Sequence, residues 1–413
     1  MLDKEGTRQL AYVVYVDAVE PIPGRDRVEA AVIGGWQTMV PKGAFKPGDP
    51  GVYFEIDSKV PIDKSPFEFC AKYKGHIKTQ KFKTPEGQFW SQGLLMAAAD
   101  FGWKVESTYI IDDNGVQHTP GTDSAFLTKQ LGIVYYEVED NKRKAKVNPN
   151  ARINAALMRH PRIAKKYGRV IKKNKFLRWA FLLFFGKKKD SRSWIEGVPK
   201  TDEERIENRP WTLEASDVKW VATEKIDGTS TTFYLKRGKG FQKPEYLVCS
   251  RNVVFDTPAR AEKNYYSETL GGNVYLEMSE KYQVREALEK LLEQRPSAEW
   301  VAIQAETYGE GIQKRDYSLK GHRICAFNLR FSDCGRVGTL EMKDLLEPLG
   351  IPCVPVILEE MTLPSTIEEL REFVHSAPSV IDGKMKEGIV FRTLDGNDSF
   401  KCVDPEFLVK YHS

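Results

Sequence analysis

The sequence lacks the features that define several protein classes. Its 6 cysteines form no Cys-x-x-Cys pair, which argues against a zinc ribbon or a disulfide framework and fits a reducing compartment. The longest apolar run, 176–185, is interrupted by Arg178 and is half the roughly 20 residues that a membrane span requires. The first residues lack the basic and apolar regions of a signal peptide. We therefore expect an intracellular protein, cytoplasmic or in the host cytoplasm if it is viral.

The chain of 413 residues has an ordinary globular composition, with 41% hydrophobic and 29% charged residues. This composition excludes a collagen-like or wholly disordered chain, and the length favours about two to three domains. The net charge of +4 hides an uneven distribution. Segment 142–189 has no Asp or Glu and holds 17 of the 62 Lys and Arg, which leaves 45 basic against 58 acidic residues elsewhere.

Part of this basic segment has helical periodicity. One stripe at 3.6 residues per turn is formed by Arg162, Lys165, Lys166, Arg169, Lys172 and Lys173. We predict a cationic amphipathic helix whose stripe contacts the phosphates of a nucleic acid, with a solvated insertion as the alternative. The apolar run 176–185 is expected to pack inside the protein, and peripheral membrane contact is the less favoured interpretation.

Short apolar runs separated by turn residues occupy the first part of the chain, at 10–16, 28–33, 36–40, 51–56 and 92–96. This pattern predicts a meander of strands that closes as a small β-barrel and ends near residue 135. Residues 211–413 mix predicted strands with helices at 284–293 and 366–376, the second capped by Ser365. The predicted fold class is α+β with antiparallel sheets, and 136–210 is a basic, partly helical insertion or linker.

Lys225 lies in the run TEKIDGTS, at 223–230. A lone Lys-x-Asp-Gly is a weak signal, since composition gives about one chance match in ten chains of this length. Companion motifs in a fixed order strengthen it: SRN at 250–252, ETYGEGIQ at 306–313, AFN at 326–328, KEGIVF at 386–391 and SFK at 399–401. Together they resemble the motifs of the covalent nucleotidyltransferase superfamily, which includes ATP-dependent polynucleotide ligases and messenger-RNA capping enzymes.

Within that superfamily the sequence is most similar to the RNA ligase 5 group, in which an OB-fold domain precedes the catalytic domain. The similarity lies in EPIPG at 20–24, GWQ at 35–37, KPGD at 46–49, EIDS at 55–58, SQGL at 91–94 and KTDEER at 200–205. It implies an OB-fold nucleic-acid-binding domain at 1–135 and a nucleotidyltransferase domain at 211–413. DNA ligases and capping enzymes place the OB domain after the last motif, whereas this sequence continues for 12 residues beyond Lys401 to Ser413.

The chemistry of adenylylation assigns roles to the motif residues. A lysine amine attacks the α-phosphate of ATP only when deprotonated, so burial or nearby positive charge must lower its pKa. Lys225 is the candidate nucleophile. Carboxylates must hold the Mg²⁺ or Mn²⁺ that neutralises the phosphates. Asp227, Glu306 and Glu387 are the candidates, acting partly through water because Mg²⁺ dehydrates reluctantly.

The resemblance implies further contacts with the nucleotide. Lys401 resembles the lysine that contacts the α-phosphate, and Phe327 the aromatic residue that stacks on adenine. The full set implied for ATP binding is Glu224, Lys225, Gly228, Arg251, Glu306, Phe327 and Lys401.

Two positions depart from the family pattern. Val403 stands where a second motif lysine is frequent, so its role is vacant or passes to Lys410. Arg315 stands where related ligases tend to have asparagine.

The expected function is therefore that of an ATP-dependent RNA ligase sealing 3′-hydroxyl and 5′-phosphate ends through a lysyl-AMP and an adenylylated 5′ end. The resemblance implies a nick in duplex RNA or an RNA–DNA hybrid as substrate. Two alternatives stay open: a guanylyltransferase that uses GTP, and a non-catalytic relative that only binds nucleic acid.

Overall fold

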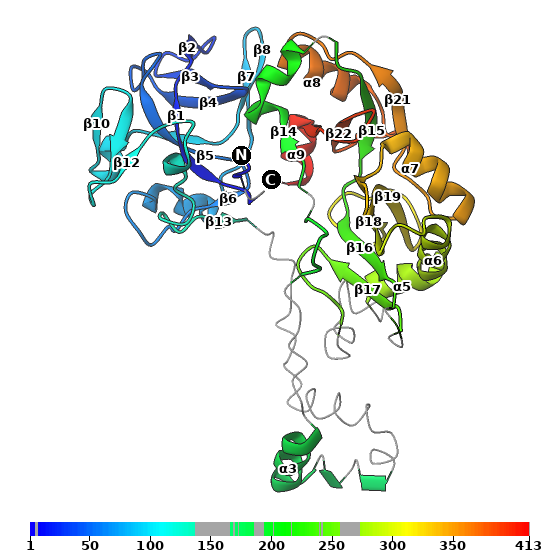
Figure 1. Ribbon diagram of the computed structural model, residues 1–413. Helices are drawn as coiled ribbons and strands as arrows, with labels where there is room; N and C mark the ends of the chain where they lie inside the picture. The colour runs from blue at the N-terminus through cyan, green and yellow to red at the C-terminus, as the bar shows by residue number, and fades with distance from the viewer. Residues whose placement is uncertain are drawn as a thin grey trace.

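Two globular units make up most of the described chain (Figure 1). The computed structural model describes residues 1–4, 7–136, 166–167, 170–171, 173–185, 194–200, 202–215, 217–238, 240, 243–256 and 273–412. In Figure 1 the N-terminal unit is blue to cyan and the C-terminal unit is green to red, and both termini lie where the units meet.

The N-terminal unit is built of short antiparallel strands. Its sheets are β1-β5-β9, β2-β3-β4, β10-β11-β12, β7-β8 and β13-β6. Their bounds are β1 Ala11–Tyr15, β2 Ala18–Pro21, β3 Val28–Ile33, β4 Trp36–Pro41, β5 Pro50–Phe54, β6 Ser58–Lys59, β7 Gln80–Thr84, β8 Gly87–Ser91, β9 Leu94–Met96, β10 Lys104–Glu106, β11 Tyr109–Ile111, β12 Gln117–His118 and β13 Val134–Tyr135. Every residue of β5 is buried, which fits a central strand of this unit.

The expected closed β-barrel is not present as one continuous ring of paired strands in the described part of this unit. The reason is visible where β4 passes β8 and β9. The Met39 N–H donates to the Ser91 hydroxyl, 3.0 Å away, instead of to a neighbouring strand's carbonyl. A single backbone bond, from the Gln92 N–H to the Gln37 oxygen at 2.7 Å, joins the same segments. These strands therefore lie together without forming a ladder.

The C-terminal unit contains two five-stranded sheets, ordered β17-β16-β18-β19-β20 and β14-β23-β22-β15-β21. The strands are β14 Glu204–Arg205, β15 Trp220–Lys225, β16 Thr229–Lys236, β17 Glu245–Ser250, β18 Trp300–Gly309, β19 His322–Phe331, β20 Gly335–Arg336, β21 Val356–Met361, β22 Gly388–Thr393 and β23 Ser399–Val403. All neighbours are antiparallel except β14 and β23, so the predicted α+β class with antiparallel sheets is confirmed.

Helices cover both sheets of the C-terminal unit. They are α5 Val274–Lys281, α6 Val284–Gln294, α7 Thr339–Leu346, α8 Ile367–Ser376 and α9 Pro405–Tyr411. Apolar side chains of α5, α6 and α7 share one core with β16, β18 and β19, and α8 packs in a second core with β15, β22 and β23. The segment expected to be a linker up to residue 210 contributes β14 to the second sheet, where Glu204 lies opposite Phe400.

The start of α8 lies one residue later than predicted. Thr366, not Ser365, is the N-cap: its hydroxyl accepts from the Glu369 N–H, and the Glu369 carboxylate accepts from the Thr366 N–H, both at 3.2 Å. Serine and threonine stand side by side here, and each has a glutamate three residues on, so the capping-box pattern alone does not choose between them.

A polar network buried between the two units centres on Asn208. Its side-chain oxygen accepts from Trp36 Nε1 at 2.6 Å and from the Tyr12 hydroxyl at 3.2 Å. Its amide donates to Glu55 at 2.8 Å and to Glu204 at 2.6 Å. Val403 and Leu408 belong to the same apolar core as N-terminal strands. The two units are therefore packed against each other by specific contacts.

Asn208→Ala should destabilise the protein by about 1–3 kcal/mol, because it leaves buried groups of Trp36, Tyr12 and Glu55 without this partner. Thermal or denaturant unfolding measures the effect. Asn114→Ala, in an exposed turn, is the matched control and should leave stability nearly unchanged. Equal stability of the two variants would contradict the role of this network.

The basic segment is described only in part. Arg162, Lys165, Arg169 and Lys172 of the predicted stripe lie outside the described residues, whereas Lys166 and Lys173 are described and exposed. The helix α3, Lys175–Phe185, follows them. No described helix is long and apolar enough to cross a bilayer.

The expected internal packing of the apolar run 176–185 holds for only part of α3. The side chain of Phe181 is buried, but Phe176 and Trp179 are 68% and 59% exposed. In Figure 1, α3 lies away from both globular units.

Candidate active site

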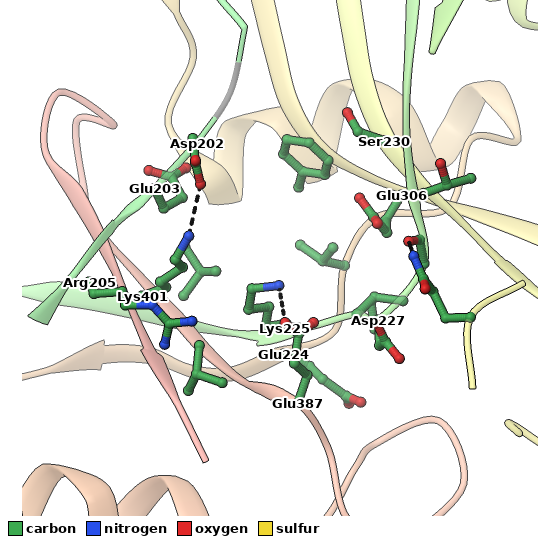
Figure 2. Close-up of a pocket in the computed structure, with 18 of the residues that line it drawn as sticks. Asp202, Glu203, Arg205, Glu224, Lys225, Asp227, Ser230, Glu306, Glu387 and Lys401 are labelled. Atoms are coloured by element: carbon green, nitrogen blue, oxygen red, sulfur yellow. Dashed lines mark hydrogen bonds and ion pairs between the residues drawn. The ribbon is translucent and has the colours of Figure 1, made fainter. Parts of the chain in front are cut away.

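The motif residues meet in one pocket lined by both sheets of the C-terminal unit. The pocket has a volume of about 290 Å³. Its lining includes every residue predicted for catalysis, metal or nucleotide binding: Glu224, Lys225, Asp227, Gly228, Arg251, Glu306, Phe327, Glu387 and Lys401. Figure 2 shows Lys225 and Lys401 on the same side of the pocket, each directed at a different carboxylate.

Lys225 is the last residue of β15 and lies opposite Gly388 of β22. Its Nζ is 2.6 Å from Oε1 of Glu387. Burial by itself lowers the pKa of Lys225, but the carboxylates of Glu387, Glu306 and Asp227 outweigh burial and raise this pKa above its usual value. The low pKa expected for the nucleophile therefore requires a positive charge that offsets these carboxylates.

The carboxylates of Asp227, Glu306 and Glu387 influence one another in the pocket. Burial, and then the proximity of Glu387 and Asp227, raise the pKa of Glu306 to about 8, although Lys225 opposes this. Asp227 Oδ2 is buried and has no hydrogen-bond partner among the described residues. Both observations fit a site that accepts a cation. Within the described residues, no three His, Cys, Asp or Glu side chains converge closely enough to hold a metal ion directly.

Lys401, in β23, lies on the same sheet as Lys225 with β22 between their strands, and it donates to Asp202 Oδ1 at 2.8 Å. Burial lowers the pKa of Lys401 and the cations Arg8 and Arg205 lower it further, while Asp202 opposes them. Asp202 also accepts from Arg251 at 3.1 Å. The Asp202 carboxylate is therefore surrounded by cations, as a bound phosphate group would be.

Two of the predicted nucleotide contacts have structural roles. The Glu224 carboxylate accepts from the Ser379 hydroxyl at 2.5 Å and from the Val380 N–H at 2.7 Å, and burial raises its pKa. Gly228 leaves no room for a side chain, because a Cβ would meet the Thr307 carbonyl oxygen and lie 3.0 Å from Cγ of Glu306. A glycine here lets the chain after Lys225 turn against β18.

The side chains of Phe327 and Arg251 differ in their exposure to solvent. Phe327, in β19, is half-buried and packs beside Ile226 and Val354 in the pocket wall. The side chain of Arg251 is 51% exposed and is held by Asp202. Phe327 therefore offers a ring inside the pocket, and Arg251 a cation at its mouth.

The sequence reasoning missed several pocket residues. Arg8, Asp57 and Tyr135 belong to the N-terminal unit, and His412 directly follows α9. Asp57 lies within the EIDS run at 55–58, whereas no motif in the sequence marks Arg8, Tyr135 or His412. Asp202 and Arg205 also line the pocket, within the 200–205 run that suggested the resemblance to ligases.

The two departures from the family pattern have structural explanations. The Arg315 guanidinium is buried, donating to the Met385 carbonyl at 2.9 Å and to Asp382 at 2.8 Å, so it fixes a loop instead of lining the pocket. Lys410 is exposed on α9 and is not among the residues that line the pocket. The additional cations come from Arg8 and Arg205.

A family model described as RNA ligase matches residues 218–412, which contain the candidate nucleophile, the three carboxylates and Lys401. These residues form an RNA ligase domain. A model described as an OB-fold domain matches residues 10–97, so this RNA ligase domain follows an OB-fold domain. The predicted resemblance to RNA ligases with an N-terminal OB-fold domain is confirmed.

The RNA ligase of Naegleria gruberi is similar in structure over nearly the whole chain. Its structure with PPi gives a TM-score of 0.69 at 24% identity, covering 98% of this chain and 99% of that one. A lysine-to-alanine variant with ATP and Mn and a lysine-to-methionine variant with AMP and Mn each give 0.68 at 24% identity with the same coverage. At this identity the likeness establishes the shared fold. No curated protein matches the chain.

Proposed function

We propose that this protein is an ATP-dependent RNA ligase that joins a 3′-hydroxyl end to a 5′-phosphate end. The observation that carries the proposal is the convergence of Lys225, three carboxylates and Lys401 in one pocket of the RNA ligase domain. The ATP- and Mn-containing structures of the Naegleria ligase, which share this fold, support ATP and a divalent cation as the ligands.

In the first step the Lys225 amine attacks the α-phosphorus of ATP. A phosphorus–nitrogen bond forms, the bond to the bridging oxygen breaks and pyrophosphate leaves, so that AMP remains on Lys225. Lys225 must first give up its proton and its 2.6 Å contact with Glu387. Lys401 turns from Asp202 to the α-phosphate and compensates its charge. The half-buried ring of Phe327 lies against adenine.

Asp227, Glu306 and Glu387 are the residues that would hold Mg²⁺ or Mn²⁺, partly through water. The unpartnered Asp227 Oδ2 supports this assignment, as does the pKa of Glu306, which burial and then the neighbouring carboxylates Glu387 and Asp227 raise. A bound divalent cation neutralises phosphate oxygens and also offsets the carboxylates that raise the pKa of Lys225.

In the remaining steps AMP passes from Lys225 to the 5′-phosphate of the RNA, and the 3′-hydroxyl then attacks that activated phosphate and releases AMP. The substrate we propose is a nick in duplex RNA or in an RNA–DNA hybrid, with the OB-fold domain clamping the duplex. Backbone shape and 2′-hydroxyls, rather than base sequence, would mark the correct strand. The exposed Lys166 and Lys173 support a phosphate contact for the basic stripe.

Sealing of matched nicked duplexes tests this function. The substrates differ only in carrying ribose or deoxyribose at the 3′-hydroxyl end, and product is measured with ATP and Mg²⁺. We expect faster sealing of the ribose substrate by the wild type and none by Lys225→Ala. Equal rates on the two substrates would contradict RNA specificity, and no sealing of either would contradict the ligase activity.

A further inference from the structure

Aromatic side chains, several of them exposed, extend from the active-site pocket onto the OB-fold domain. Tyr135, at the end of β13, lines the pocket and is 44% exposed. The guanidinium of Arg8, also in the pocket wall, lies 5.7 Å from the centre of its ring. The next residue, Tyr136, stacks on His76 with ring centres 3.6 Å apart and planes 4° from parallel. The path therefore leaves the pocket through two consecutive tyrosines.

His76 connects these tyrosines to the short helix η1, Glu68–Tyr73. Its backbone N–H donates to the Tyr73 carbonyl at 3.0 Å. The ring of Tyr73 is 41% exposed, and Phe69, on the same helix, is 60% exposed. Apolar rings of this size on an open surface are typical of a binding site.

Lysines flank the same rings. The Nζ atoms of Lys72 and Lys78 lie 5.3 and 5.5 Å from the centre of the Tyr73 ring. Segment 59–83, which contains η1, has seven lysines, Lys59, Lys64, Lys72, Lys74, Lys78, Lys81 and Lys83, against the two acids Asp63 and Glu68. Asp57, beside the path, has a carboxylate oxygen 3.6 Å from Arg205. The surface therefore has the positive charge that suits a polyanion.

We propose that the RNA strand beside the reactive end binds across this surface, which we call the aromatic–lysine surface: Phe69, Lys72, Tyr73, Lys78, Tyr135 and Tyr136. The lysines contact phosphates, and the rings lie against riboses and against the base that is exposed at the nick. The inference rests on the proposed function, since it takes the pocket as the place where the RNA end reacts. A protein partner would share the exposed rings, but the excess of lysine and the continuity with the pocket favour RNA.

The test measures the affinity of the full-length protein for a fluorescent nicked RNA duplex at several salt concentrations. One double variant, Phe69→Ala with Tyr73→Ala, removes the rings, and another, Lys72→Gln with Lys78→Gln, removes the charges. Tyr73→Phe keeps a ring that can stack. Trp211→Ala is the matched control, because Trp211 is 60% exposed and lies outside both the pocket and this surface.

We expect the ring variant to bind RNA about tenfold or more weakly, as for loss of a stacking contact. The lysine variant should weaken binding and flatten the slope of log K against log salt by about two. Tyr73→Phe and Trp211→Ala should bind like the wild type. If both double variants keep the wild-type RNA affinity and salt slope, the proposal is overturned. The exposed rings would then fit a protein partner instead of RNA.

Self-adenylylation with labelled ATP, which needs no RNA, separates this proposal from the proposed function. A ring variant that binds weakly but still forms the AMP adduct at the wild-type rate supports the surface. If the ring variant also loses adenylylation, its weak RNA binding does not count as support. The RNA affinity and salt slope of the lysine variant then decide the proposal, because that variant keeps the packing of η1. A wild type that forms no adduct would contradict the ligase function, while the RNA affinities would still test the surface.

Discussion

Lys225→Ala should abolish the transfer of label from α-labelled ATP to the protein. Lys225 is the amine that the motifs, the pocket and the RNA ligase domain place next to three carboxylates, whereas the other motif lysine of the pocket, Lys401, is paired with Asp202. We expect no detectable labelled protein, because removal of the nucleophile eliminates the covalent step itself. The measurement is labelled protein after denaturation, with Mg²⁺ present.

Lys219→Ala is the matched control for this variant. Lys219 immediately precedes β15, its side chain is 46% exposed, and it contacts Thr362 and Glu360 instead of the pocket. It should retain wild-type labelling. Persistent labelling of Lys225→Ala would contradict the mechanism, and preferential labelling by GTP would favour a guanylyltransferase over an ATP-dependent ligase.

Lys401→Ala should slow self-adenylylation by about 100-fold or more, the usual cost of removing one group that stabilises charge in the transition state. Lys401 is buried beside the nucleophile, and its charge is balanced by Asp202 at 2.8 Å. The variant removes the cation that we assign to the α-phosphate. Single-turnover rates of AMP transfer to the protein, measured at saturating ATP, report this step directly.

Lys410→Ala is the companion to Lys401→Ala. Both lysines belong to the last elements of the chain, but Lys410 is exposed on α9 and does not line the pocket. Its removal should leave the rate of adenylylation unchanged. A loss of rate in Lys410→Ala similar to that in Lys401→Ala would mean that Lys410 does supply the second motif lysine.

Motif residues could be placed from the sequence because each stands at a strand end or in a strand whose apolar pattern is clear. Lys225 closes the buried strand β15, and Glu306 lies within β18. Their convergence follows from the order of strands in two antiparallel sheets. The α+β class and the main strands were predictable for the same reason.

Contacts between distant segments were not predictable. Asp202 holds Lys401 across 199 positions of sequence, and no spacing or periodicity in the chain connects them. Arg8 and Tyr135 reach the pocket only because the OB-fold domain packs against the catalytic domain through Asn208. The direction of the pKa shift of Lys225 depends on the fold of the catalytic domain, because it reflects burial and three carboxylates, Glu387, Glu306 and Asp227, at once.

The most direct test of the central claim is the site of AMP attachment in the wild-type protein. After incubation with ATP and Mg²⁺, peptide mapping by mass spectrometry should find a single AMP adduct, located on Lys225, and addition of pyrophosphate should remove it by reversing the first step. An adduct on another residue, or the absence of any adduct from folded protein, would contradict the account.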